Sequence, residues 1–216
     1  MSRKKYLLLF ITLIILISLI SFPNFLKAPD EKFLKEEVKN EINQNPEFSD
    51  KFSSPISNPL QRITKKSFGT YVTPQNSPIN PEKFTGYHTG VDFEIFSSEE
   101  DVRVPIYAIC DGTVVVKKVA SGYGGVTVLQ CSLNNSPITV IYGHLELSSV
   151  KNVVGDKIKQ GEIIGNLGKA YSIETSGERK HLHLGIYKGS KINILGYTQN
   201  KNDLTNWINV EDYLNR

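Results

Sequence analysis

The sequence predicts an all-β, mostly antiparallel domain that follows a single N-terminal transmembrane helix. Two observations lead to this prediction. Residues 6–26 carry no charged side chain, and residues 6–22 are almost wholly apolar. From about residue 58, short runs rich in β-branched residues alternate with glycine, and no helical periodicity exceeds two turns before the C-terminal tail.

The first 26 residues are predicted to be a membrane anchor or a signal peptide. The uncharged stretch 6–26 is long enough to cross a bilayer. Arg3, Lys4 and Lys5 precede it, so residues 1–5 are expected to form a cytoplasmic basic tail and the remainder to be exported. No small-x-small cleavage site follows, which favours an uncleaved anchor over a cleaved signal peptide.

The charge balance argues against a nucleic-acid partner. The chain has 25 Lys+Arg and 22 Asp+Glu. Removing the three basic residues of the N-terminal tail leaves 22 against 22 over residues 6–216. A neutral body lacks the basic patch that nucleic-acid binding requires.

Residues 27–57 are expected to be a linker or stalk, and residues 58–216 the folded domain. Leu34, Val38 and Ile42 recur every four residues, which allows a short stalk helix, although a flexible spacer fits the Asn- and Ser-rich stretch equally well. The predicted strands of the domain lie in residues 104–109, 112–119, 124–131, 137–145 and 181–189, whereas glycines divide residues 154–168 into two-residue apolar pieces.

Two cysteines, Cys110 and Cys131, lie in the part predicted to be exported. A hairpin about Ser121 and Gly122 would make them cross-strand neighbours, and export permits a disulfide. Two reduced cysteines buried in strands remain the alternative.

The four histidines and one aspartate indicate a metal-dependent hydrolase. His88 and Asp92 form a His-x-x-x-Asp pair, His144 lies in a Tyr-Gly-His-Leu segment, and His181 and His183 form His-Leu-His. Alternate residues of a strand share one face, so His181 and His183 should point to the same side. His88, Asp92 and one histidine of the His-x-His pair supply the three ligands of a catalytic zinc site, leaving two histidines for acid–base chemistry.

The order of these motifs resembles that of the lysostaphin-type zinc metalloendopeptidases, which cut peptide cross-links in bacterial cell walls. The resemblance covers roughly residues 58–190. Beyond the histidines it includes Ser67-Phe-Gly69, Pro105-Ile-Tyr-Ala108, Asp111-Gly-Thr-Val114, Tyr123-Gly124, Val154-Gly155-Asp156, Gln160-Gly161 and Ile164-Gly165.

The resemblance implies a barrel-sandwich hybrid fold (the duplicated hybrid motif) and zinc-dependent hydrolysis of peptide bonds in peptidoglycan. It implies one Zn²⁺ per chain bound by His88, Asp92 and His183, with His144 and His181 as the catalytic histidines. It implies peptidoglycan peptide as the partner. The N-terminal segment predicts a single-pass protein of the bacterial cell membrane with its catalytic domain outside the cytoplasm, or a secreted protein if the segment is cleaved.

Three positions depart from the family pattern. Tyr71 stands where an arginine is usual, residues 170–180 are longer and more charged than the usual Gly-Pro-ended loop, and Gly185 replaces a glutamate. These positions are expected to affect loops of the substrate groove more than the metal.

Two other functions are open from the sequence. Residues 154–165 also resemble biotinyl and lipoyl carrier domains, but Met1 is the only methionine and such carriers need no set of histidines. The second is a catalytically silent relative that binds peptidoglycan or regulates other wall hydrolases; the complete set of ligands disfavours it.

Overall fold

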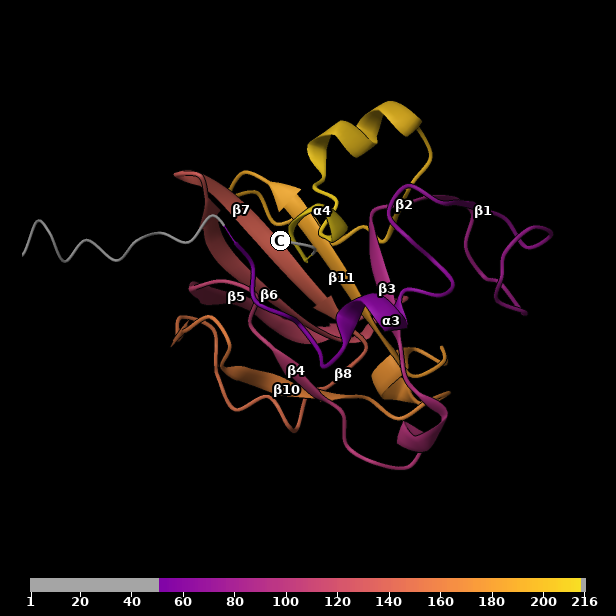
Figure 1. Ribbon diagram of the computed structural model, residues 1–216, viewed down its shortest axis with the longest axis horizontal. Coiled ribbons are helices and arrows are strands. Elements are labelled where there is room, and N and C mark those ends of the chain that lie inside the picture. Colours follow the sequence, from indigo (N-terminus) through magenta and orange to yellow (C-terminus); the bar gives the residue numbers. More distant parts are fainter. Residues whose placement is uncertain (1–50, 215–216) are drawn as a thin grey trace, which may run out of the picture. The chain divides into compact units, whose positions relative to one another are not determined.

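The computed structural model describes residues 51–214 (Figure 1). The predicted membrane segment 6–26 and most of the predicted linker 27–57 lie outside the described residues. Among residues 51–214, none of the helices combines the length and the apolar character that crossing a bilayer requires.

The strands of the described region form three antiparallel sheets, which confirms the predicted all-β, antiparallel class. The largest has the order β3 (Gly90–Glu94), β11 (His181–Lys188), β7 (Ser136–Gly143), β6 (Gly124–Leu133), β5 (Gly112–Ala120) and β9 (Lys157–Ile158). A second contains β4 (Pro105–Tyr107), β10 (Ile163–Leu167) and β8 (Leu145–Glu146). A third contains β1 (Tyr71–Val72), β2 (Gly86–His88) and β12 (Tyr197–Thr198).

Helices in the described region are short. The α-helices are α3 (Pro59–Arg62) and α4 (Glu211–Leu214). The 3₁₀ helices are η1 (Ser97–Glu99), η2 (Ile173–Thr175) and η3 (Lys201–Asn206).

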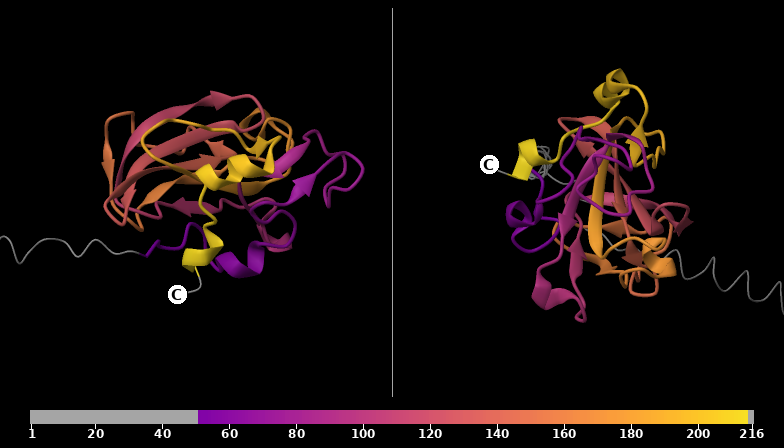
Figure 2. Two further views of the ribbon diagram at one scale, coloured as in Figure 1. Left: turned by 90° about the horizontal axis from the view of Figure 1, so that it is seen from above. Right: turned by 90° about the vertical axis from the view of Figure 1, so that its right-hand side faces the viewer.

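The main core lies between the six-stranded sheet and the β4–β10–β8 sheet, which packs against one of its faces (Figure 2). Alternation along β11 places Leu182, Leu184 and Ile186 in this core. The opposite face of the six-stranded sheet carries a smaller apolar cluster around Ile141 and Trp207. The histidines of β11 point to that second face, so the sheet separates them from the main core.

Residues before position 58 also contribute to the core. Phe52 is 9% exposed and Ile56 is 1% exposed. The backbone N–H of Ser53 donates to the carbonyl of Ile109 at 3.0 Å. The packed part of the chain therefore includes the last few residues of the segment predicted as a linker.

A disulfide joins Cys110, which lies two residues before β5, to Cys131 on β6, with their Cα atoms 6.3 Å apart. Cys131 lies opposite Gly112 in the ladder, so the two cysteines are offset by two residues, and a register shift between Val114 and Val116 brings them one residue closer to facing each other. A Cβ at Gly112 would lie 2.8 Å from the Cys131 sulfur, so glycine leaves room for the bond. Of the two alternatives for the cysteines, the structure shows the disulfide.

Candidate metal centre and cleft

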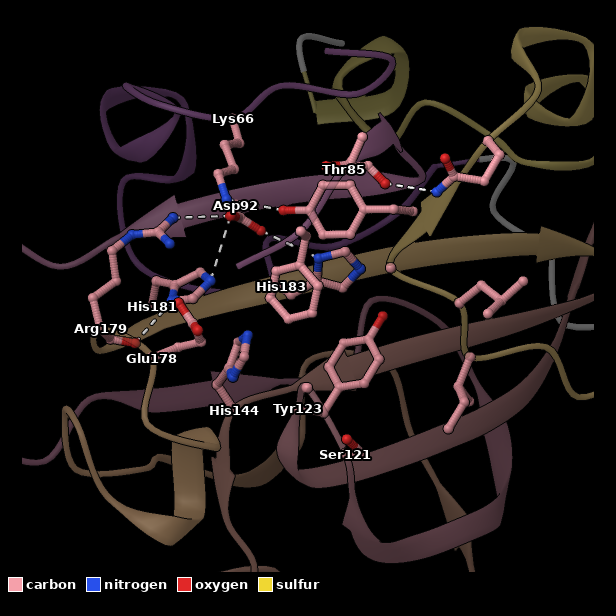
Figure 3. Close-up of a pocket in the computed structure, with 17 residues that line it drawn as sticks. Lys66, Thr85, Asp92, Ser121, Tyr123, His144, Glu178, Arg179, His181 and His183 are labelled. Atoms are coloured by element: carbon pink, nitrogen blue, oxygen red, sulfur yellow. Dashed lines mark hydrogen bonds and ion pairs between the residues drawn. The ribbon is translucent and has the colours of Figure 1, made fainter. Parts of the chain in front are cut away.

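The five predicted site residues come from four segments that meet at one end of the six-stranded sheet; Figure 3 shows Asp92 and the histidines 144, 181 and 183. Asp92 on β3 and His183 on β11 are direct neighbours in the antiparallel ladder. His181 lies two residues before His183 and points to the same face. His88 ends β2, and His144 lies between β7 and β8.

Three donor atoms converge on one point. His88 Nε2 lies 3.0 Å from His183 Nδ1 and 3.2 Å from Asp92 Oδ1. His183 Nδ1 lies 3.2 Å from the same carboxylate oxygen. A tetrahedral zinc site, with ligands about 2.0–2.1 Å from the ion, has donor atoms about 3.3 Å apart. The triangle formed by His88, Asp92 and His183 therefore fits a small divalent cation such as zinc. Their role as ligands stays a prediction.

A hydrogen bond on the far side of the His88 ring determines which ring nitrogen carries the proton. His88 Nδ1 lies 3.2 Å from the Ser67 carbonyl oxygen. A carbonyl can only accept, so Nδ1 carries the proton and Nε2 presents its lone pair to the triangle. The His88 side chain is fully buried, which keeps water from competing for that lone pair.

Asp92 is ionised within this cluster. Burial alone would raise the pKa of its carboxyl, but the surrounding His88, His181 and His183 rings hold that pKa well below its usual range. Its backbone N–H donates to the Lys66 carbonyl at 2.9 Å, which fixes the start of the side chain. The carboxylate is therefore anionic and held in place, as a metal ligand should be.

His144 and His181 lie together beside the triangle, with ring centroids 4.2 Å apart. His181 Nδ1 lies 2.9 Å from the Arg179 carbonyl oxygen and therefore carries a proton. His181 Nε2 lies 3.4 Å from Asp92 Oδ2. Both rings thus lie next to the triangle without completing it.

The backbone of His144 is unusual. Its φ of 63° is in the left-handed region, which non-glycine residues rarely adopt. The His144 carbonyl accepts a hydrogen bond of 2.8 Å from the Gly168 N–H, which holds this conformation. Burial lowers the pKa of His144 well below its usual value, so the ring is neutral near pH 7. Its Nδ1 has no hydrogen-bond partner among the described residues.

The site also contains polar residues that were not predicted from the sequence. The Tyr123 ring meets the His183 ring edge-on at 5.2 Å, and its buried hydroxyl has no partner within residues 51–214. Tyr197 lies 5.2 Å from the His88 ring and accepts a hydrogen bond of 2.9 Å from Lys66 Nζ. Burial raises the pKa of both tyrosines, so both hydroxyls stay protonated. Tyr123 belongs to a motif of the family resemblance, whereas nothing in the sequence pointed to Lys66 or Tyr197.

Glycines make room for the His183 ring. A Cβ at Gly90 would lie 2.5 Å from the Leu184 carbonyl oxygen and 2.8 Å from His183 Nε2. A Cβ at Gly143 would lie 2.4 Å from the Tyr123 ring and 3.4 Å from His183 Cβ. The strands on either side of β11 thus lack side chains where the imidazole lies.

The site opens into a cleft with a volume of about 380 Å³. Asp92 and the histidines 144, 181 and 183 line its floor. Its walls include Phe84, Gly122, Ile194 and Leu195, which are apolar. Such a cleft has space for an extended peptide segment beside the triangle of His88, Asp92 and His183.

The charged loop 170–180, expected to affect the groove more than the metal, also reaches the site itself through Arg179. Its guanidinium Nη2 donates to Asp92 Oδ2 at 2.8 Å, so this residue touches the candidate metal ligand itself. The other departures lie elsewhere. Tyr71 is 45% exposed on β1 and packs on Tyr87, and Gly185 lies under the Trp207 ring.

Comparisons with known proteins agree with this geometry. The sequence profile of Peptidase family M23 matches residues 86–194, which contain all five predicted site residues. Endolysin 2638A of Staphylococcus phage 2638A is 34% identical over 148 residues, which are 65% of this chain and 28% of the endolysin. The chain therefore matches well under a third of that relative's length.

A solved structure supports the fold. The catalytic domain of the antimicrobial peptidase lysostaphin from Staphylococcus simulans matches with a TM-score of 0.50 and 22% identity. The match covers 76% of this chain and 100% of the lysostaphin domain. At this level of identity the similarity speaks for the fold alone.

Proposed function

We propose, because this chain belongs to peptidase family M23, that it is a zinc-dependent endopeptidase that hydrolyses peptide bonds in peptidoglycan cross-links. The convergence of His88 Nε2, Asp92 Oδ1 and His183 Nδ1 within 3.2 Å of one another is the observation that carries the proposal. The resemblance to lysostaphin-type enzymes supports cell-wall peptide as the substrate class.

His88, Asp92 and His183 would hold the zinc ion. When bound, zinc lowers the pKa of a coordinated water and polarises a carbonyl group. Asp92 supplies the negative charge that partly balances the cation, and its low pKa keeps it ionised across the neutral range. The carbonyl of Ser67 holds the His88 ring in the tautomer that can bind.

His144 and His181 would perform the proton transfers of peptide hydrolysis. His181 Nδ1 donates to a backbone carbonyl, so His181 Nε2, on the side of Asp92, is the nitrogen that would exchange a proton with the attacking water. His144 lies next to it with a neutral ring, because burial lowers its pKa. Two adjacent imidazoles can thus accept a proton from water and return one to the leaving amine nitrogen.

We also propose that the protein is located at the bacterial cell membrane. Residues 6–26 would anchor the chain in the bacterial cell membrane and residues 58–216 would lie outside the cytoplasm, where peptidoglycan is found. The uncharged length of this segment and the preceding basic residues support the anchor. N-terminal sequencing of the native protein tests it: a start near residue 28 would show cleavage instead.

The central experiment combines metal analysis with hydrolysis. The purified full-length chain is expected to contain about one zinc per molecule and to release new amino groups from purified peptidoglycan. Asp92→Ala should lose both zinc and activity, because a ligand is missing. Asp101→Ala removes an exposed aspartate outside the cleft and should keep both. A wild-type chain that binds no zinc, or binds it without cutting peptidoglycan, would contradict the proposed function.

A further inference from the structure

Arg179 lies two residues before His181, at the end of the loop that leads into β11. Its side chain is only 11% exposed, although it carries a permanent charge. A buried guanidinium needs anionic partners, and those partners show what the residue does.

The guanidinium group bridges two carboxylates on the same face of β3. Arg179 Nε donates to both carboxylate oxygens of Glu94, at 3.0 and 2.9 Å, and Nη2 also donates to Glu94. Arg179 Nη2 donates in addition to Asp92 Oδ2 at 2.8 Å (Figure 3). Asp92 and Glu94 are two residues apart on one strand, so their side chains share a face and a single planar group reaches both.

The contact divides the two oxygens of Asp92 between different tasks. Arg179 makes the shorter contact with Oδ2, at 2.8 Å against 3.4 Å from His181 Nε2, whereas Oδ1 points into the triangle with His88 and His183. A carboxylate without such a partner could rotate or turn both oxygens toward a cation. The arginine contact therefore leaves Oδ1 as the oxygen that faces the triangle.

The backbone next to Arg179 is held in place by the side chain of Lys180. Lys180 Nζ donates to the carbonyl oxygens of Glu99, Glu100 and Val102, at 2.8, 3.2 and 2.6 Å. The Arg179 carbonyl meanwhile accepts the proton of His181 Nδ1. Arg179 thus contacts one predicted ligand through its side chain and one predicted catalytic histidine through its backbone.

We propose that Arg179 is a positioning residue that orients Asp92 for metal binding, with Glu94 as the anchor that holds the guanidinium in place. The inference rests on the proposed zinc site. Partners of this kind, which orient a metal ligand, typically contribute about 10- to 100-fold to metal affinity. An ion pair that served only folding would contribute to stability and leave metal affinity unchanged.

The test measures the zinc dissociation constant of the metal-free, full-length protein by competition with a chromophoric chelator. Arg179→Ala is expected to weaken zinc binding by about 10- to 100-fold. Arg179→Lys keeps the charge but not the planar fork, so its affinity should fall between those of the wild type and Arg179→Ala. Glu94→Gln should weaken binding less than Arg179→Ala, because Arg179 keeps its contact with Asp92.

Arg103→Ala is the matched control, since Arg103 is exposed and lies outside the cleft; its affinity should equal that of the wild type. Each variant is measured at a temperature where circular dichroism shows it folded. A folded Arg179→Ala that binds zinc within twofold of the wild type would overturn the proposal. If Arg179→Ala does not fold, Arg179→Lys decides, and wild-type affinity in that variant overturns it. A wild type that binds no zinc, with Arg103→Ala behaving likewise, would instead overturn the metal site on which the proposal rests.

Discussion

Both faces of β11 are buried from His181 to Ile186, but they have different roles. Leu182, Leu184 and Ile186 are each 0% exposed and pack in the main core. His181 and His183, which alternate with them, are 2% and 4% exposed. Their ring nitrogens meet polar atoms of Arg179 and Asp92 instead of apolar side chains. Burial alone therefore does not distinguish a core residue from a site residue. The polar or apolar character of the neighbouring groups distinguishes them.

Substitutions on the two faces should therefore affect different properties of the protein. On the core face a truncation leaves a cavity, and the loss appears in the free energy of unfolding. On the cleft face a truncation removes a ring whose nitrogens meet polar atoms of the site, and the loss should appear in the reaction.

The largest expected effect is on the cleft face. His144→Ala and His181→Ala should each lower the rate of peptidoglycan hydrolysis by roughly 10²- to 10⁴-fold, because each removes a proton-transfer group. Both variants should keep about one zinc per chain, since neither ring belongs to the triangle. Elemental analysis and an amino-group release assay measure the two quantities. Loss of zinc in either variant would show that the roles of the histidines are misassigned.

The next effect is on the core face. Leu182→Ala should lower the free energy of unfolding by about 2–5 kcal/mol, because Leu182 is fully buried between the sheets. The zinc affinity of the folded protein should stay unchanged. Urea denaturation monitored by circular dichroism measures the stability. Leu60→Ala, at a leucine that is 48% exposed, is the control and should change it by less than about 0.5 kcal/mol. A weakened zinc affinity in Leu182→Ala would mean that the two faces are coupled.

The Cys110–Cys131 disulfide lies in the main core and closes a loop with a sequence separation of 21. Replacing both cysteines with serine should lower the free energy of unfolding by about 3 kcal/mol, because the unfolded chain regains conformational freedom. Adding a reductant to the double variant should have no further effect. Thiol titration of the unfolded, unreduced wild type should find no free thiol, and two free thiols would refute the bond.

The smallest expected effect is a pH dependence of the free energy of unfolding in the metal-free protein, caused by His183 on the cleft face. Burial lowers the pKa of His183 to about 4, against about 6.5 in the unfolded chain. The unfolded state therefore binds a proton first, so stability is full above pH 6.5 and is lost as the pH falls toward 4. Between pH 7.5 and pH 5 this histidine should cost about 2 kcal/mol of unfolding free energy. Urea titrations at several pH values measure it. In metal-free His183→Ala the corresponding loss should be smaller, and an equal loss would assign the effect to other groups.

The sequence predicted the parts of the molecule that depend on local patterns. Residues 124–131, for example, begin with two glycines and are rich in β-branched side chains, and β6 extends from Gly124 to Leu133. The sequence also singled out the five residues that the structure brings together at the triangle and beside it. Histidine is scarce in this chain, and each histidine lies in a motif of the family resemblance.

Other features depend on contacts between distant segments and left no local signal. Arg179 reaches Asp92 and Glu94 across 87 and 85 positions of the chain, respectively. Lys66 meets Tyr197 across 131 positions. The sequence left the pairing of Cys110 and Cys131 undecided. The register of the hairpin contains a shift between Val114 and Val116 that the residue pattern does not reveal.

The glycines beside His183 have a consequence for reading mutational scans of this chain. An alanine at Gly90 would collide with the Leu184 carbonyl and the His183 ring, and one at Gly143 would collide with the Tyr123 ring. A scan that scores only activity would therefore mark Gly90 and Gly143 as essential beside the histidines. These glycines take no part in the chemistry; they are needed because they leave volume for the groups that do.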